Sequence, residues 1–295
     1  MSLPYFLEKL LVLPQYLMPK QLLTELAGIV AKKKATPFIY FLMKRFAKHY
    51  GVNMHEALHE DFQSYANFNE FFTRQLKSDA RPLALTSADY LSPVDGKISQ
   101  VGTIADYGEI FQAKRHWYSL KTLLGGDSLF AEEFMDGSFA TIYLSPKDYH
   151  RIHMPCTGRL THMIHIPGDL FSVNPLTART VPNLFARNER LVCRFEGEKS
   201  PFIMVLVGAT IVGSMATVWH GVVNSPRPGV VREWTYYSNP ITLTIGEEMG
   251  KFLLGSTVIL IFPKNTMQFK ESWKAGISVQ MGSEMGDFPK NDRNR

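Results

Sequence analysis

Residues 202–219 read FIMVLVGATIVGSMATVW and carry no charged side chain. An uncharged stretch of this length approaches what a membrane-spanning helix needs. The segment is, however, rich in valine, isoleucine and threonine, and it is interrupted by Gly208 and Gly213. β-Branched residues favour extended structure, and glycines inside such runs mark turns or bulges. We therefore interpret residues 202–219 as two buried strands and not as a membrane span.

Other short apolar runs flank this segment, separated by glycine, proline, aspartate and asparagine. Several alternate apolar and polar residues with period two, which is typical of strands with one buried face. The runs cover residues 97–101, 139–144, 159–166, 241–245 and 257–262. Together they predict a β-rich, largely antiparallel core that begins near residue 90.

The beginning of the chain carries a helical pattern instead. Leucines recur at helical spacing between Leu7 and Leu26, and Pro37 is placed to open a helix that runs to about His49. These features predict an α+β fold with a helical region over residues 1–60 and a β-rich domain over residues 61–295.

Composition and charge narrow the classes of partner. The chain has 295 residues, of which 45% are hydrophobic and 20% charged, and a net charge of +5. Such a cationic excess suits either a nucleic acid or an anionic membrane surface. The cations of residues 32–48 alternate with phenylalanine, tyrosine and leucine, which favours a bilayer interface over nucleic acid. The alternative is an ordinary amphipathic helical layer packed on the core.

Two segments of the β-rich part carry titratable side chains. Asp95 lies in the sequence Ser-Pro-Val-Asp-Gly, where an aspartate commonly serves only to form a turn. His150 and His153 lie three residues apart, shortly after Ser145-Pro146. This spacing suits a zinc pair, acid–base catalysis or a plain surface turn, and no HExxH motif or Cys/His set supports zinc.

Two later segments complete the candidates. A turn, PGDLFSVN at residues 167–174, is followed by Arg187 and Arg190. A guanidinium matches the geometry of phosphate, so Arg187 is a candidate phosphate ligand, although a solvated charged turn is the simpler interpretation. Gly255-Ser256 precedes a β-branched apolar run and lacks the flanking glycines of the esterase GxSxG motif.

Together these patterns resemble the phosphatidylserine decarboxylase family, in its membrane-associated proteobacterial form. The resemblance rests on LGST at residues 254–257, YHRIHMP at residues 149–155 and NLFARNER at residues 183–190. These motifs occur in the family's order, and the resemblance extends over nearly the whole chain, including the N-terminal helical part.

The resemblance implies self-cleavage between Gly255 and Ser256, which gives a large fragment and a small one, residues 256–295. Ser256 would become a pyruvoyl group at the new N-terminus of the small fragment. By the same resemblance, Asp95, His153 and Ser256 form the self-cleavage triad, in which His153 takes the Ser256 proton and Asp95 holds the imidazole.

For the decarboxylation, the resemblance implies that His150 acts as the acid–base group while the pyruvoyl carbonyl serves as the electron sink. No metal is implied. The substrate would be phosphatidylserine and the product phosphatidylethanolamine. The β-rich domain would then be the catalytic one, and the N-terminal helices would dock on the membrane.

The resemblance also places the protein peripherally on the cytoplasmic face of the cell membrane, as a homodimer. Three alternatives stay open at this point: a decarboxylase of a lipid with another backbone, such as an ether lipid; a serine hydrolase that uses Ser256; and a non-enzymatic lipid-binding β domain. The hydrolase and the binding domain both predict an uncut chain.

Overall fold

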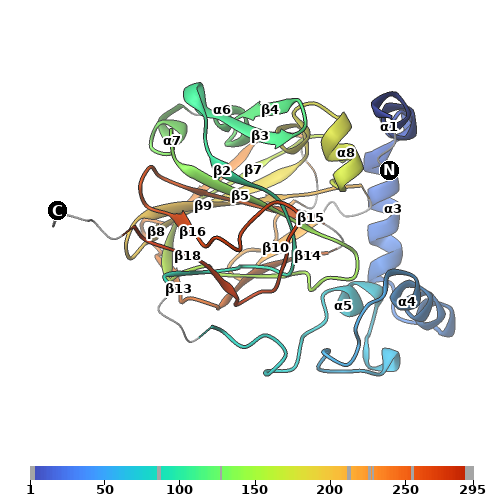
Figure 1. Cartoon of the computed structure of the whole chain (residues 1–295). Coiled ribbons are helices and arrows are strands. Elements are labelled where there is room, and N and C mark those ends of the chain that lie inside the picture. The colour runs from blue at the N-terminus through green and yellow to red at the C-terminus, as the bar shows by residue number, and fades with distance from the viewer. Residues whose placement is uncertain are drawn as a thin grey trace.

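The structure is a computed structural model that describes residues 4–84, 88–126, 128–210, 214–224, 227, 229–253 and 256–289. A large twisted sheet forms its centre, and the N-terminal helices α1, α3 and α4 lie together at one end of this sheet (Figure 1). The helices and 3₁₀ turns are α1 Tyr5–Val12, α2 Pro14–Leu17, α3 Lys20–Lys32, α4 Pro37–Tyr50, η1 Phe62–Ser64, α5 Phe68–Phe72, η2 Asp106–Gly108, α6 Leu120–Leu123, α7 Ser128–Glu132, α8 Pro175–Thr180 and α9 Leu184–Arg187.

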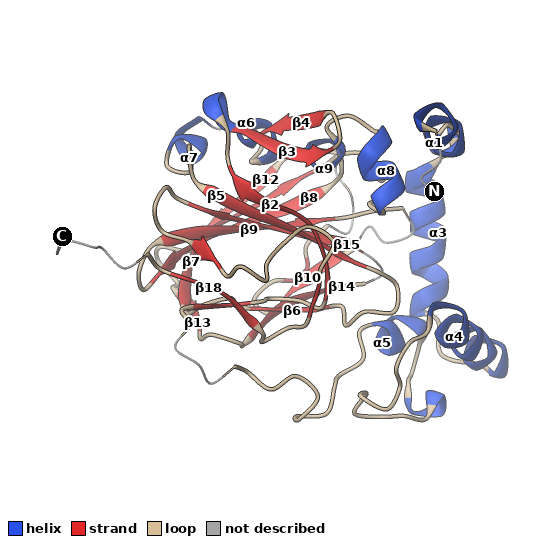
Figure 2. Ribbon diagram, in the orientation of Figure 1, coloured by secondary structure: helices blue, strands red, loops and turns tan. Residues whose placement is uncertain are grey.

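Strands dominate the rest of the described chain (Figure 2). The main sheet has the order β12-β7-β8-β9-β15-β5-β2-β17, and β13 also pairs with β7. Its strands are β2 Gly96–Thr103, β5 Ser138–Leu144, β7 Gly158–Ile166, β8 Arg190–Gly197, β9 Pro201–Val207, β12 Arg232–Thr235, β13 Ile241–Leu243, β15 Ser256–Phe262 and β17 Ser278–Val279.

Three smaller sheets complete the core. Their orders are β11-β10-β14-β6, β1-β18-β16 and β3-β4. The strands are β1 Tyr90–Leu91, β3 Glu109–Ala113, β4 His116–Ser119, β6 Arg151–His153, β10 Met215–Thr217, β11 Gly221–Val222, β14 Glu248–Phe252, β16 Gln268–Phe269 and β18 Glu284–Asp287. All the strand pairs of these four sheets are antiparallel, which confirms the predicted α+β class with a largely antiparallel core.

The stretch 202–219 forms strands β9 and β10, as predicted. Residues 211–213 of that stretch lie outside the described residues. Within the described part of the chain, no helix combines the length and the apolar character that crossing a membrane requires.

Strand β15 lies in the middle of the main sheet and begins at Ser256. It pairs with β5 on one side and β9 on the other, and all seven of its residues are buried. Val258 and Leu260 pack into the core on one face of the sheet, and Ile259 and Ile261 into the core on the other. A fragment that starts at Ser256 would therefore stay bound by two hydrogen-bonded ladders and two apolar faces.

The helix predicted after Pro37 is α4. Thr36 caps its beginning by accepting a hydrogen bond from the Ile39 amide, and Pro37 occupies the first turn. Gly51 ends it in the left-handed conformation, with φ of 73°, which glycine adopts without strain. Aromatic contacts of Phe46 with three phenylalanines of α5 then fix α4 against α5.

Candidate active site

Ser256 is a buried hydroxyl at the head of the central strand. Ser256 pairs with Leu144, the last residue of β5, and is fully shielded from solvent. Within the described chain its Oγ has no hydrogen-bond partner. An unsatisfied buried hydroxyl costs about 1–3 kcal/mol, so such a group in a native structure calls for a functional explanation. Gly255 lies outside the described residues.

His150 lies at the same end of the sheet as Ser256. Its backbone carbonyl accepts a hydrogen bond from the Phe252 amide at 3.0 Å, at the end of β14. The loop that leaves β5 and the segment that enters β15 therefore lie side by side. The imidazole is completely buried and packs on Phe72, with ring centroids 4.1 Å apart.

The hydrogen bonds of His150 define its tautomer. Nδ1 lies 2.8 Å from the Asp148 carbonyl oxygen, which can only accept, so Nδ1 carries the proton. Nε2 is then a lone pair, and in the described chain it has no partner. Burial lowers the pKa of His150 to about 3, against a smaller opposing effect from the Asp148 carbonyl. His150 is therefore a neutral proton acceptor at neutral pH.

His153 has the same tautomer but an occupied second nitrogen. Nδ1 donates to the Gly246 carbonyl at 2.8 Å, and Nε2 accepts from the Tyr149 hydroxyl at 3.2 Å. Burial lowers the pKa of His153 below its usual value. A neutral imidazole of this kind is suited to receive a proton from a serine hydroxyl.

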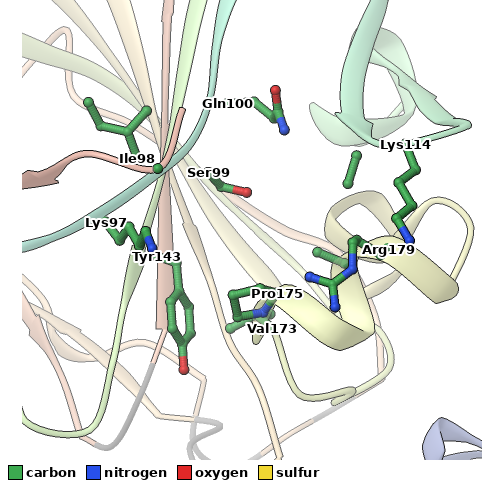
Figure 3. A pocket seen from close by; sticks show the side chains of 12 residues that line it. Lys97, Ile98, Ser99, Gln100, Lys114, Tyr143, Val173, Pro175 and Arg179 are labelled. Atoms are coloured by element: carbon green, nitrogen blue, oxygen red, sulfur yellow. The ribbon is translucent and has the colours of Figure 1, made fainter. Parts of the chain in front are cut away.

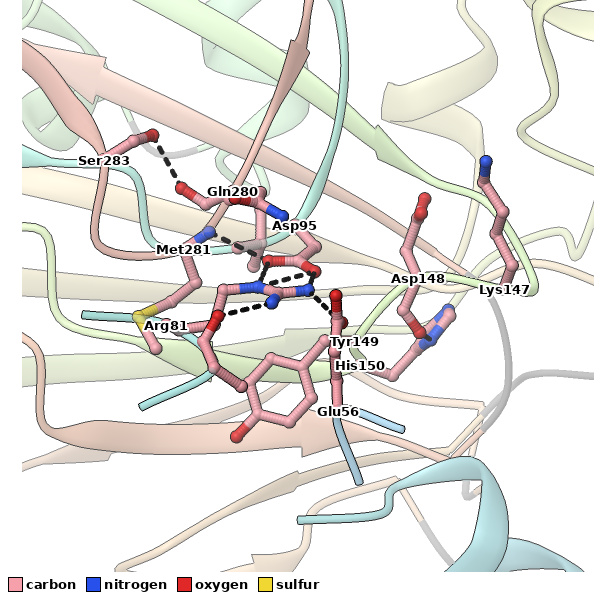
Figure 4. Close-up of polar contacts among 12 residues, drawn as sticks. Glu56, Arg81, Asp95, Lys147, Asp148, Tyr149, His150, Gln280, Met281 and Ser283 are labelled. Atoms are coloured by element: carbon pink, nitrogen blue, oxygen red, sulfur yellow. Dashed lines mark hydrogen bonds and ion pairs between the residues drawn. The ribbon is translucent and has the colours of Figure 1, made fainter. Parts of the chain in front are cut away.

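Asp95 does not hold the His153 imidazole directly. Its carboxylate accepts two bonds from Arg81 Nε, at 2.9 and 3.1 Å, and one from Arg81 Nη2 at 2.6 Å (Figure 4). It also accepts from the Met281 amide at 2.9 Å. In the described chain no hydrogen bond joins Asp95 to His153, so the Gly246 carbonyl and not Asp95 orients the imidazole.

The backbone nevertheless brings Asp95 and His153 into one neighbourhood. The His153 amide donates to the Pro93 carbonyl at 2.9 Å, which fixes the Asp-Gly turn beside β6. Arg81 is shared between Asp95 and Glu56, whose carboxylate lies 2.8 Å from Nη2. Sequence reasoning missed Arg81 and Glu56, because nothing in their local sequence indicates a partner so distant along the chain.

A pocket of about 490 Å³ opens beside these residues. Its lining includes Asp95, Arg81, Tyr149 and Lys147. It adjoins a second pocket of about 270 Å³, because both are lined by Lys97, Tyr143 and Pro175 (Figure 3). The second pocket extends toward α8 at Arg179. The two pockets together extend from Asp148 and Tyr149, the residues that precede His150, to α8.

Arg187, a candidate phosphate ligand for which a solvated turn was the simpler interpretation, pairs with a carboxylate. Its Nη2 lies 3.0 Å from the Asp169 carboxylate, and its guanidinium stacks over the Phe171 ring at 5.1 Å. Arg190 is buried and donates to the carbonyls of Thr122, Leu123 and Asn188. Neither arginine lines the pockets described above.

Comparison with known proteins identifies the family. The family model described as phosphatidylserine decarboxylase matches residues 68–287, and a model described as PSD matches residues 10–51. The chain belongs to the phosphatidylserine decarboxylase family. It is 60% identical over 279 residues to the phosphatidylserine decarboxylase proenzyme of Dechloromonas aromatica (strain RCB), covering 95% of this chain and 98% of that protein. The proenzyme of Azoarcus sp. (strain BH72) is 59% identical over 281 residues, with 95% and 96% covered.

Members of the phosphatidylserine decarboxylase family are carboxy-lyases, and the relatives' designation as proenzymes implies processing. A pyruvoyl group formed from a serine requires a hydroxyl that is free to attack the preceding carbonyl, next to a group that accepts its proton. Ser256 supplies an unpaired hydroxyl among the described residues, and His150 and His153 are neutral imidazoles on the segment that hydrogen-bonds to Phe252. No group of three or more His, Cys, Asp or Glu side chains positioned to hold a metal ion occurs among the described residues.

Acidification is expected to destabilise the folded chain through His150. An unfolded histidine titrates near pH ~6.5, whereas burial lowers the pKa of His150 to about 3. Between these values the unfolded chain binds a proton that the folded chain does not. The free energy of unfolding should therefore fall by about 1.4 kcal/mol per pH unit as the pH drops below ~6.5.

The measurement is denaturant unfolding between neutral pH and about pH 5, compared for the chain with His150 and its His150→Gln variant. The glutamine variant should lose this component of the pH dependence. If the free energy of unfolding changed equally with pH in both chains, His150 would not be buried in its neutral form.

Proposed function

We propose that the chain converts phosphatidylserine to phosphatidylethanolamine with a pyruvoyl group made from Ser256 by autocatalytic cleavage at Gly255-Ser256. The observation that carries the proposal is the buried Ser256 Oγ, which has no partner in the described chain and heads the central strand. The identity of about 60% to the proenzymes supports this chemistry, as do the neutral tautomers of His150 and His153.

Self-cleavage would begin with proton transfer from Ser256 Oγ to His153 Nε2, once the Tyr149 hydroxyl has left that nitrogen, while Oγ attacks the Gly255 carbonyl. The peptide bond becomes an ester, and elimination across Ser256 releases the carboxylate of Gly255. Tautomerisation and hydrolysis then release ammonia and leave the pyruvoyl group on the fragment that begins at residue 256. Glycine before the serine suits this attack, because no side chain shields its carbonyl.

Once formed, the pyruvoyl carbonyl would supply an electron sink for the pair released with CO2. The chain's own residues would contribute the rest. His150 Nε2 would accept a proton and return it to the reacting carbon, since Nδ1 is fixed on the Asp148 carbonyl. Phe72 and the surrounding core would exclude water, in which a carboxylate is well solvated and resists decarboxylation.

The intact mass of the purified protein under denaturing conditions tests self-cleavage. We expect two fragments from a cut between Gly255 and Ser256. The smaller fragment should carry a pyruvoyl group in place of its serine amine. A single uncut chain from the unmutated sequence would remove the pyruvoyl proposal and favour a serine hydrolase or a binding domain. Conversion of phosphatidylserine into phosphatidylethanolamine by the processed protein tests the substrate.

The second part of the proposal is that residues 1–60 dock the enzyme peripherally on the cytoplasmic face of the cell membrane, with residues 61–295 as the catalytic domain. The orientation of α1 supports docking. Glu8 is buried and pairs with Arg179 at 2.9 Å and Lys114 at 3.1 Å. Glu8 thus anchors α1 to the core, and the apolar residues of α1 other than the buried Val12 face outward.

Helix α3 has the same inverted arrangement. Its buried residues are Thr24 and Ala31. The exposed apolar side chains of the N-terminal helices include Phe6, Leu7, Leu10, Leu11, Leu17, Leu22, Leu26, Ile29, Val30, Phe38 and Phe41. A large exposed apolar surface with neighbouring lysines is typical of an interfacial membrane site.

A triple variant, Phe6→Ser, Leu17→Ser and Phe38→Ser, tests this docking surface. These side chains are 70%, 84% and 65% exposed, so their replacement should leave the fold and self-cleavage intact. We expect binding to anionic phospholipid vesicles to fall by at least about tenfold, because each buried apolar side chain contributes about 1.5–3 kcal/mol. Vesicle sedimentation measures the change.

The matched control is Tyr107→Asn, which removes a side chain that is 95% exposed in the turn between β2 and β3. Asparagine tolerates the positive φ of this position. Vesicle binding should not change in the control. Unchanged binding in the triple variant would contradict the docking surface.

The homodimer implied by the resemblance stays a prediction, and light scattering of the processed enzyme tests it.

A further inference from the structure

Arg74 is a buried cation without a counterion. Its residue is only 4% exposed, and in the described chain no carboxylate lies within 4 Å of its guanidinium. Nη2 donates to the Lys147 carbonyl at 3.0 Å, whereas Nε is buried and has no partner. Burial lowers the pKa of Arg74, because desolvation disfavours the charged form. An uncompensated buried guanidinium is costly and indicates that an anion completes the site.

Three consecutive contacts place Arg74 next to the proposed catalytic segment. The Phe72 ring packs on His150, and the Thr73 carbonyl accepts from Arg151 Nε at 2.9 Å. Arg74 then reaches the Lys147 carbonyl. The segment 72–74, at the end of α5, therefore runs along residues 147–151, and Arg74 lies at the pocket end of this contact.

The pocket of 490 Å³ is lined by Arg74 together with two exposed lysines, Lys97 and Lys147. Neither lysine forms an ion pair with the described residues, and Lys147 is visible beside Asp148 in Figure 4. Three cations thus face this space with no internal partner for their charge.

The acidic groups that line the same pocket are already engaged. Glu56 and Asp95 are both bound by Arg81, at 2.8 and 2.6 Å. Asp148 accepts from the Ser145 amide at 2.7 Å and from the Ser145 hydroxyl at 2.8 Å. The pocket is lined by four cationic side chains and three carboxylates, so its cations exceed its carboxylates by one, and Arg74, Lys97 and Lys147 are the cations without an ion pair to a described residue.

We propose that Arg74, assisted by Lys97 and Lys147, binds the phosphodiester group of the phospholipid substrate, an inference that rests on the proposed decarboxylase function. The pocket gives the phosphodiester a planar, hydrogen-bonding cation at its inner end and two mobile ammonium groups at its rim. The adjoining pocket, which shares Lys97, leads the glycerol backbone toward α8 and the N-terminal helices (Figure 3).

The headgroup carries two anions, and the chemistry favours the phosphodiester at this site. A guanidinium paired with the carboxylate would stabilise the group that must leave as CO2, and so would oppose the reaction. The phosphodiester is unchanged between substrate and product, so binding it costs nothing in the chemical step. Loss of Arg74 should then raise KM and leave kcat nearly unchanged.

The test is Arg74→Gln, with Arg187→Gln as the matched control, because Arg187 is an exposed arginine outside the pocket. Two probes separate the anions: dihexanoylphosphatidylglycerol has the phosphodiester without a carboxylate or amine, and N-hexanoylserine has the carboxylate without a phosphate. Calorimetry gives both dissociation constants, and intact mass and thermal unfolding are recorded for each variant.

We expect Arg74→Gln to cleave itself normally and to bind dihexanoylphosphatidylglycerol about tenfold to hundredfold more weakly, with N-hexanoylserine unaffected. Its Tm should stay the same or rise, since an unpaired buried charge is removed, and Arg74→Lys should recover part of the affinity. Arg187→Gln should bind both probes like the unmutated protein.

If Arg74→Gln lost binding of N-hexanoylserine alone, Arg74 would be the ligand of the substrate's carboxylate and not of its phosphodiester. A lower Tm with unchanged affinity for both probes would overturn it in favour of a structural role. Failure of self-cleavage in the unmutated chain would instead refute the proposed function, and the probe measurements would still decide whether Arg74 binds a phosphodiester.

Discussion

Replacing Ser256 with alanine is expected to leave the chain uncut and without decarboxylase activity. Alanine removes the only atom of this side chain that can attack the Gly255 carbonyl or become a carbonyl itself. It also removes a buried hydroxyl that has no partner in the described chain, so the free energy of unfolding should be unchanged or higher. Intact mass, product formation and thermal unfolding measure the three effects.

Thr141→Val is the matched control for Ser256→Ala. Thr141 is a buried hydroxyl on the neighbouring strand β5, opposite Ile259 of β15. Its replacement by an isosteric apolar residue should leave cleavage intact. An Ser256→Ala chain that still divided at the same bond, or an uncut one that still decarboxylated phosphatidylserine, would end the pyruvoyl proposal.

Replacing His150 with alanine is expected to separate the two reactions. Self-cleavage should proceed, since the proposed base is His153, whereas kcat for decarboxylation should fall by about 10²–10⁴-fold, the usual contribution of a positioned acid–base group. His150 is suited to this role because its Nε2 is a lone pair on a fully buried imidazole and its Nδ1 is fixed on the Asp148 carbonyl.

His153→Ala is the natural counterpart, because it removes an imidazole of the same tautomer only three residues away. It should prevent cleavage. Fragment masses and single-turnover product formation distinguish the variants. His150→Gln is a control for the cavity that His150→Ala would leave, because glutamine fills more of the space of the imidazole. If His150→Ala stayed uncut while His153→Ala divided normally, the roles of the two histidines would be exchanged: the free Nε2 of His150 would then be the base for Ser256.

Much of the architecture follows from local sequence. The period-two alternation and β-branched runs predicted β2, β5, β7, β9 and β15, because a strand is specified by which of its faces is buried. The helix α4 follows from Thr36, Pro37 and Gly51, which act on the backbone within a few residues. The Gly255-Ser256 site and the histidine pair were likewise readable as motifs, although their roles rest on the resemblance.

The partners of the site residues could not be read from the sequence. Asp95 is bound by Arg81, fourteen positions earlier, and His153 by the carbonyl of Gly246, ninety-three positions later. Main-chain carbonyls are present at every residue, so no sequence signal distinguishes the one that orients an imidazole. Only the pairing of β6 with β14 brings that carbonyl to His153.

The arginines show the same division. The sequence offered Arg187 as a candidate phosphate ligand, with a solvated charged turn as the simpler interpretation. The fold exposes Arg187 and pairs it with Asp169, whereas it buries Arg74 at a pocket with no carboxylate of the described chain within 4 Å. Sequence determines the charge of a side chain, and local pattern determines its strand or helix. Only tertiary packing determines how much water and which opposite charges surround it, and these set its pKa and its capacity to bind an anion.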